Sequence, residues 1–467
     1  METTRPKVLV IGLDCAAPLL VFERWREILP NLAGLMERGV YGDLESTIPP
    51  ITVPAWTCMM TSKDPGQHGF YGFRNRKDHS YDELYFANAR YVKLPTLWNY
   101  LSRNRLTSIL IGVPQTYPPK PLNGIMVSSF LAPDKSNYTY PPEVAAELDA
   151  VADGDYVIDV KKFRTDDKDW LLESIHVMTK KRFKVVREFM KTKDWDFFMF
   201  VEMGIDRIHH GFWRFFDTGH RLYEPGNKYE NAIRDYYVAV DEEIGRTLEL
   251  IDADTHVMVV SDHGAKSMKG GIVVNEWLQQ EGYLALKEQP AEQTPLKTSM
   301  IDWSKTRAWG EGGYYGRIFM NVRGREPQGI ILPENYERER DELLRKLEGI
   351  CDPEGKNIGT RVFKPQEVYR EVNNVPPDMI VYFGDLDWRS MGSVGVGAIH
   401  VFENDTGPDD ANHDRNGIFI FNGPAVPQAV RGSRLEGVTL YDVTPTVLDL
   451  FGLDIPDGLV GKKIEFK

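Results

Sequence analysis

The chain has 467 residues, of which 42% are hydrophobic and 27% are charged, a balance typical of a globular protein with a large core. Its 56 Lys and Arg against 69 Asp and Glu give a net charge of −13, which disfavours binding to a nucleic-acid polymer. The apolar runs are too short to span a bilayer and the three cysteines lie far apart, so we expect a cytoplasmic protein with no membrane span and no disulfide framework.

Short apolar runs predict the strands of a parallel sheet, because strands covered on both faces lack polar alternation. In chain order these runs are Lys7–Leu13, Thr107–Val113, Asp196–Glu202, His256–Ser261, Met379–Phe383 and Gly417–Phe421. Helical patterns lie between them, at Leu97–Arg103, Asp169–Thr192, Lys228–Asp252 and Tyr336–Leu347. The alternation predicts an α/β fold with a doubly wound, mostly parallel sheet flanked by helices, in which ligands bind beyond the carboxyl ends of the strands.

Two segments interrupt this alternation, 117–167 and 269–376. We interpret both as insertions that form a lid or substrate-specificity region over the edge of the sheet. The catalytic core would then comprise residues 1–116, 168–268 and 377–467.

Metal-ligating side chains follow two of the predicted strands. Asp262 and His263 come directly after the fourth strand, and Asp206 and His210 come shortly after the third. The four-residue spacing of the second pair places both side chains on one helical face, where they can bind one divalent cation, and turns His209 about 100° away. Taken alone, Asp262 and His263 also fit a capped turn, and Asp206 and His210 also fit a salt bridge at the start of a helix.

Three further residues complete the candidate site. Asp14 ends the first strand and His413 precedes the last one, so three carboxylates and three imidazoles adjoin strand ends of one sheet, enough to supply two metal ions. Thr52 lies between Pro50 and Pro54 at the predicted start of a helix, where free backbone N–H groups stabilise an anion. Taken singly, Asp14 and Thr52 fit ordinary helix caps and His413 fits a structural histidine.

Together these motifs resemble the alkaline phosphatase superfamily over most of the chain, and within it the type I phosphodiesterase/nucleotide pyrophosphatase branch. The nucleophile helix of that branch and the turn after it are similar to Thr52-Val53-Pro54 and Pro65-Gly66-Gln67-His68-Gly69. The closing helix of the superfamily is similar to Asp442-Val443-Thr444-Pro445-Thr446. Its two-metal ligand set is matched in type and order by Asp14, Asp206, His210, Asp262, His263 and His413.

The resemblance implies a metal-dependent phosphoester hydrolase that acts on a small-molecule phosphoester through a phosphothreonine intermediate on Thr52. It implies two divalent ions per chain, zinc or else manganese. One ion would be held by Asp206, His210 and His413, and the other by Asp14, Thr52, Asp262 and His263.

The resemblance is weaker for the groups that contact the substrate, because the phosphoryl-contacting asparagine of the branch has no clear counterpart. The candidates for substrate contact are Arg74, Asn75 and Lys266. We also expect aromatic residues of the lid either to contact the leaving group or to pack a small core of their own, namely Trp303, Trp309, Tyr314 and Tyr315.

Three alternative functions share this scaffold. Sulfatases have a Cys/Ser-x-Pro-x-Arg signature. At the corresponding positions this chain has Thr52 instead of the Cys or Ser and Trp56 instead of the Arg. In cofactor-independent phosphomutases the last histidine follows the Asp-His pair closely, whereas His413 lies 150 residues after His263. A non-catalytic phosphoester-binding protein is the third alternative, and it ranks lowest because every ligand position is filled.

Overall fold

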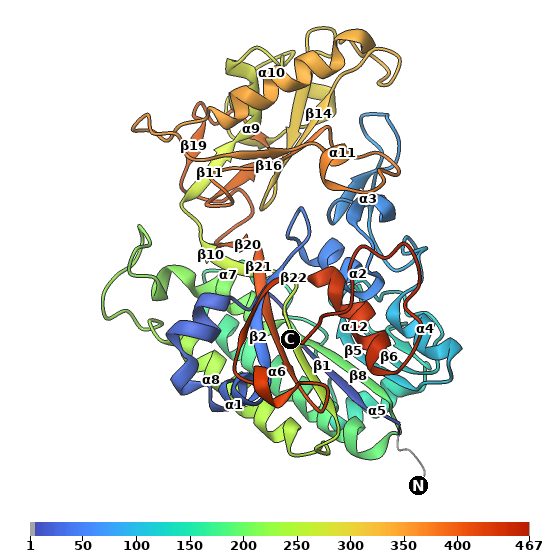
Figure 1. Ribbon diagram of the computed structural model, residues 1–467. Coiled ribbons are helices and arrows are strands. Elements are labelled where there is room, and N and C mark those ends of the chain that lie inside the picture. Colours follow the sequence, from blue (N-terminus) through green and yellow to red (C-terminus); the bar gives the residue numbers. More distant parts are fainter. Residues whose placement is uncertain (1–4, 467) are drawn as a thin grey trace.

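The structure, a computed structural model, describes residues 5–466 and is built around a nine-stranded sheet (Figure 1). In spatial order its strands are β22 (Arg434–Thr439), β2 (Val40–Glu45), β21 (Asn416–Asn422), β9 (His256–Val260), β1 (Val8–Leu13), β8 (Phe197–Glu202), β5 (Ser108–Val113), β6 (Gly124–Ser128) and β7 (Thr139–Tyr140). The five strands from β9 to β6 run parallel, whereas β21 is antiparallel to both of its neighbours. The predicted mostly parallel sheet is confirmed.

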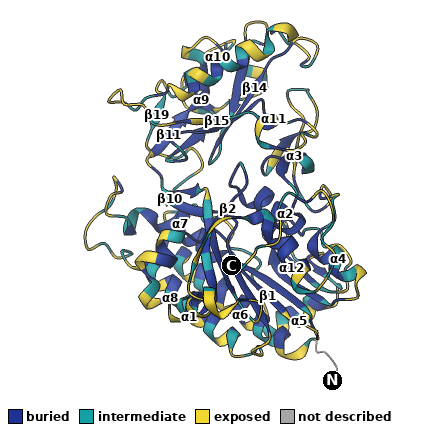
Figure 2. Ribbon diagram, in the orientation of Figure 1, coloured by how far each residue is buried: buried dark blue, intermediate teal, exposed yellow. Residues whose placement is uncertain are grey.

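Helices lie on either side of this sheet (Figure 1). One layer contains α1 (Pro30–Arg38), α6 (Lys168–Thr192), α7 (Gly204–Phe216) and α8 (Ala232–Leu248). The other contains α2 (Thr52–Thr61), α4 (Leu97–Arg103) and α12 (Val443–Leu450). Figure 2 shows the sheet buried between them, and every residue of β1, β5, β8 and β9 is buried. This double cover explains why these strands read as continuous apolar runs.

A second, smaller region lies above the central sheet in Figure 1. Its four-stranded antiparallel sheet contains β13 (Ala308–Glu311), β14 (Gly316–Met320), β16 (Met379–Tyr382) and β15 (Arg361–Phe363). Two smaller sheets contain β17 (Trp388–Met391), β11 (Gly270–Val273) and β19 (His400–Val401), and β12 (Thr294–Pro295) with β18 (Ser393–Val394). The helices of the region are α9 (Val274–Gln280), α10 (Tyr336–Glu348) and α11 (Pro365–Val368). It has a hydrophobic core of its own.

Two expected boundaries between core and insertion differ from the structure. The run Met379–Phe383 forms a strand, but β16 pairs with β14 and β15 in the second region and not in the central sheet. A buried strand has the same apolar pattern in either sheet, so the pattern could not assign it. The second region therefore extends to β19, beyond the expected limit at residue 376.

The expected insertion 117–167 also belongs largely to the core. It supplies β6 and β7 to the central sheet, and its helix α5 (Val144–Val151) packs against α6. Among the described helices, none is both long enough and apolar enough to cross a membrane.

Candidate functional site

The site lies at the carboxyl ends of three adjacent parallel strands. Asp14 directly follows β1, Asp262 comes shortly after β9, and Asp206 lies in the first turn of α7, shortly after β8. Because β9, β1 and β8 are neighbours in the sheet, the three carboxylates converge. His413 reaches the same place on β20 (Ala411–Asp414), which pairs with β10 (Gly264–Ser267).

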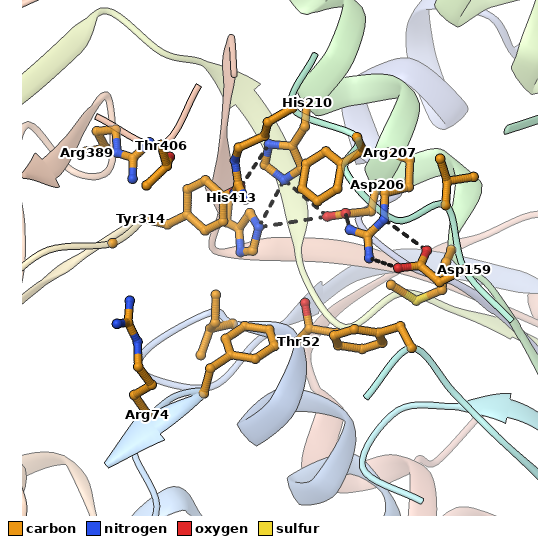
Figure 3. Close-up of a pocket in the computed structure, with 18 of the residues that line it drawn as sticks. Thr52, Arg74, Asp159, Asp206, Arg207, His210, Tyr314, Arg389, Thr406 and His413 are labelled. Atoms are coloured by element: carbon orange, nitrogen blue, oxygen red, sulfur yellow. Dashed lines mark hydrogen bonds and ion pairs between the residues drawn. The ribbon is translucent and has the colours of Figure 1, made fainter. Parts of the chain in front are cut away.

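The first cluster of ligands contains Asp206, His210 and His413, and Figure 3 shows their side chains pointing toward one another. His210 Nε2 lies 3.2 Å from Asp206 Oδ1 and 3.3 Å from His413 Nε2. The third distance, from His413 Nε2 to Asp206 Oδ1, is 3.9 Å. The three atoms thus form a compact buried triangle from two elements of the core.

The second cluster contains Asp14, Asp262 and His263. His263 Nε2 lies 3.2 Å from Asp262 Oδ2 and 3.9 Å from Asp14 Oδ1. The hydroxyl of Thr52 adjoins this cluster, with Oγ1 3.4 Å from His263 Nε2. The rings of His263 and His413 stack at 3.7 Å, which brings the two clusters side by side.

The three histidines share one arrangement. Nδ1 of His263 lies 3.1 Å from the Gly264 carbonyl, Nδ1 of His413 lies 2.8 Å from the Pro50 carbonyl, and Nδ1 of His210 lies 2.7 Å from Asp409. Each acceptor holds a proton on Nδ1, so Nε2 faces the cluster in all three residues. Nε2 carries a lone pair in neutral His263 and His413, whereas burial opposes ionisation of His210 but Asp409 and Asp206 outweigh it and raise the pKa of His210 to about 9. A metal-ligating histidine is oriented in this way.

The three carboxylates are oriented in the same way, with one oxygen held by a protein group and the other facing the cluster. Trp56 Nε1 donates to Asp14 Oδ2 at 2.7 Å, the Cys15 N–H donates to Asp262 Oδ1 at 3.3 Å, and Arg207 donates to Asp206 Oδ2. The other oxygen of each carboxylate faces its cluster. Asp14 Oδ1 and Asp262 Oδ2 accept no hydrogen bond from any residue in the described range, although both are buried.

Electrostatics shows that the second cluster lacks a positive charge. Burial raises the pKa of Asp14 well above its ordinary value, and Asp262 and Asp206 raise it further. The pKa of Asp262 is raised in the same way, first by burial. Burial lowers the pKa of His263 to about 4, so this imidazole does not supply the missing positive charge.

The donor set therefore fits two divalent cations. Each cluster offers carboxylate oxygens and imidazole nitrogens, which are zinc ligands. A cation held by Asp14 and Asp262 would offset their repulsion and would pair both orphaned oxygens, because a bound cation is often the largest local charge in a site.

Thr52 occupies the first position of α2, as the sequence predicts, and is 4% exposed. No side chain among residues 5–466 caps this helix, so its leading N–H groups are free to donate to an anion. Pro54 fits here because its missing N–H falls in the first turn.

The two accessory motifs hold α2 in place. Thr61 Oγ1, at the end of α2, is hydrogen-bonded to His68 Nε2 at 2.8 Å, and Gly69 ends the turn with a φ of 71° that suits glycine. From the C-terminal motif, Thr444 Oγ1 donates to the Met59 carbonyl at 2.7 Å. These contacts are structural and lie outside the clusters.

The three candidates for substrate contact lie in different surroundings. Arg74, at the start of β3 (Arg74–Arg76), lines the cavity that contains Thr52 (Figure 3). Asn75 does not line the cavity, and its amide accepts from the Tyr71 N–H and donates to the Gly72 carbonyl. Lys266 forms an ion pair with Asp387 at 2.7 Å and does not line the cavity.

The cavity has a volume of about 660 Å³, within the range of small-molecule sites. Of the four aromatic residues expected in the lid, Tyr314 and Tyr315 line it. Trp303 and Trp309 instead pack in the core of the second region, where Trp303 stacks on Tyr81 at 3.6 Å. The remaining aromatic lining comes mainly from outside the expected insertion 269–376, from Phe73, Phe86, Phe130 and Phe163.

Asp409 was not predicted from the sequence, although it orients His210. Besides its contact with His210 Nδ1, it accepts from Arg164 at 2.9 Å and from the Tyr314 hydroxyl at 2.8 Å. The pKa of Asp409 lies below its ordinary value, because His210 and Arg164 outweigh burial. Its position four residues before His413 is the only sequence signal, and a lone Asp in a loop carries little weight.

We expect the Asp409→Asn variant to bind the cation of the Asp206 cluster about 10- to 100-fold more weakly, because the orienting charge behind His210 is lost. Competition with a chelator measures this affinity. The matched control is Asp410→Asn, since the Asp410 side chain ion-pairs with Arg214 at 3.6 Å and its contact with His210 is made by the backbone N–H, which the substitution keeps. Equal affinity in the wild type and Asp409→Asn would show that Asp409 does not orient His210.

The sequence model of the type I phosphodiesterase / nucleotide pyrophosphatase family matches residues 8–409, a range that includes Thr52 and every cluster residue except His413. A sequence search of curated proteins finds no match.

Two solved structures are similar to the whole chain. Human ectonucleotide pyrophosphatase / phosphodiesterase 5 has a TM-score of 0.56 at 13% identity, over 97% of this chain and 96% of that one. An inactive variant of the murine protein of the same name, in complex with AMP, has a TM-score of 0.55 at 13% identity and the same coverage. At this identity the likeness shows the fold.

Proposed function

This chain belongs to the type I phosphodiesterase / nucleotide pyrophosphatase family and hydrolyses phosphoric ester bonds, and we propose that Thr52 is its nucleophile and that two divalent cations assist it. The observation that supports this most strongly is the shared orientation of the ligands. All three Nε2 atoms and one oxygen of each carboxylate face the two clusters, while the opposite atom of each side chain is held by a protein group.

The proposed reaction uses Thr52 twice. Two bound cations would stabilise the negative charge of the transition state and favour the ionised hydroxyl. Thr52 Oγ1 attacks phosphorus in line, the ester oxygen leaves, and the phosphoryl group is carried on Thr52. Water then attacks phosphorus, the bond to Oγ1 breaks, and the hydroxyl is restored.

The first turn of α2 binds and orients the phosphoryl group in this proposal, because its free N–H groups adjoin Thr52. Arg74 is a further candidate, since it lines the cavity and forms no ion pair within the described range. Its charge would favour an anionic ester over a neutral one.

The cavity supports a substrate with a flat apolar group beside the phosphoryl group. Its four phenylalanines offer ring faces and edges, which suit an aromatic ring. A phosphodiester with an aromatic or heteroaromatic group is therefore the proposed substrate class, with a small diester tested first.

Hydrolysis of bis(p-nitrophenyl) phosphate tests the proposal, and p-nitrophenyl phosphate tests the preference for diesters over monoesters. We expect Phe86→Ala to raise KM for the aromatic diester about tenfold with little change in kcat, because part of a ring contact is lost. Phe86 is 64% exposed, so its replacement costs little stability.

Phe402→Ala is the matched control, because Phe402 is 48% exposed and lies outside this cavity. It should leave KM unchanged. If Phe86→Ala raises KM equally for aromatic and for methyl esters, the ring-contact role is wrong.

A further inference from the structure

A second cavity, of about 160 Å³, lies beside the carboxyl end of β5. Its walls come from α4, from the chain just before that helix, and from the loop that follows β5. We propose that this cavity binds a small oxyanion with a hydroxyl group on or next to it. The proposal does not depend on the reaction at Thr52.

The first observation is that the side-chain amide of Gln115 is buried without hydrogen bonds to any part of the chain that the structure describes. Gln115 lines the cavity and is 4% exposed. Neither Oε1 nor Nε2 of its side chain has a hydrogen-bond partner among residues 5–466. A buried amide left unpaired destabilises the fold. Gln115 also has a φ of 65°, which is uncommon for a residue with a side chain.

The second observation is independent of the first and concerns charge. Three basic residues line the cavity, Lys93, Arg103 and Lys120, and no carboxylate of the described chain does. Lys120 Nζ donates to the Val92 carbonyl at 2.8 Å. Burial lowers the pKa of Lys120, and the like charge of Lys93 lowers it further. In a chain of net charge −13, three basic side chains without an acidic partner favour an anion.

The two observations define the ligand. Its oxyanion would face the three basic side chains and accept from the Gln115 amide N–H groups. Its hydroxyl would donate to Gln115 Oε1. Monohydrogen phosphate carries both features on one group, and a short hydroxy acid carries them on adjacent atoms. The volume is close to the roughly 150 Å³ that accommodates a six-carbon ring, which suits a group of the size of phosphate or glycerate.

The cavity is separate from the one that contains Thr52, but a thin layer of side chains lies between them. Val92 lines the small cavity and packs in a cluster with Val53, the neighbour of Thr52. Phe73 and Phe130 pack against this cluster and line the large cavity. Each cavity therefore has its own lining, and both can be filled at once.

Isothermal titration calorimetry on the metal-loaded enzyme tests the proposal, with inorganic phosphate and D-glycerate as the two probes. We expect the variants Gln115→Leu and Lys120→Ala each to bind one equivalent of probe fewer than the wild type, or to bind that equivalent at least about tenfold more weakly. Loss of a phosphate equivalent identifies inorganic phosphate as the ligand type, and loss of a glycerate equivalent identifies a hydroxy acid.

Two controls make the outcome specific. Lys297→Ala removes an exposed lysine far from this lining and should bind both probes as the wild type does. Diester hydrolysis should stay within about twofold of the wild type in Gln115→Leu and Lys120→Ala, which separates this site from the reaction at Thr52. Isotherms that are the same in the wild type and in both cavity variants would overturn the proposal.

Discussion

Replacing Thr52 by alanine is expected to lower kcat at least about 10⁴-fold while both cations stay bound. The hydroxyl is the only group of Thr52 that the proposed reaction uses, and its Oγ1 adjoins the second cluster through His263. Alanine suits the first position of α2, so the helix persists. Steady-state kinetics with an aromatic diester and elemental analysis of the same sample measure both effects.

Thr52→Ser keeps the hydroxyl and should lose far less activity than Thr52→Ala. Thr57→Ala is the matched control on the same helix, because Thr57 is also buried and its hydroxyl donates to the Val53 carbonyl at 2.7 Å. It should lower thermal stability without a comparable loss of kcat. If Thr52→Ala keeps more than about a tenth of the wild-type activity, Thr52 is not the nucleophile.

The second large effect is expected from the metal ligands. The purified enzyme should contain two divalent ions per chain, zinc or else manganese. Asp262→Asn and His210→Ala should each contain about one, and each should be inactive, because one member of a three-residue cluster is removed. Most of the fold should persist, since the buried strands and not the ions form the core.

The stability of the metal-free protein provides a second test of these ligands. Asp14 and Asp262 raise each other's cost of ionisation, so Asp262→Asn should be at least as stable as the wild type once a chelator has removed the ions. His209→Asn is the control for His210→Ala, because His209 contacts the Tyr237 hydroxyl and belongs to neither cluster. Active wild-type enzyme with fewer than one tightly bound divalent ion would rule out the two-metal site.

Much of the fold follows from the sequence because buried strands have a distinctive pattern. The strand β5 and the helix α4 begin and end within one residue of the prediction. The place of a strand in space is harder to predict, since pairing depends on distant residues. Met379–Phe383 illustrates this, because its pattern fits a strand of either sheet and only the pairing with β14 assigns it.

The ligands could be predicted because each lies at a strand end or at a helical spacing, as Asp206 and His210 do. The residues that orient them could not. Asp409 and Trp56 orient ligands that are far away in the sequence, and Arg207 orients its neighbour Asp206, but no sequence pattern marks any of the three for this role. Asn75 shows the opposite error, because proximity to the motif suggested substrate contact while local backbone groups use its amide.

The stereochemical course at phosphorus tests the central claim, that Thr52 carries the phosphoryl group during the reaction. A phosphorothioate diester of known configuration is hydrolysed in isotopically labelled water, and the configuration of the product is determined by ³¹P NMR. Two successive in-line displacements, one by Thr52 and one by water, predict net retention. Net inversion would show a single displacement by water and would contradict the account.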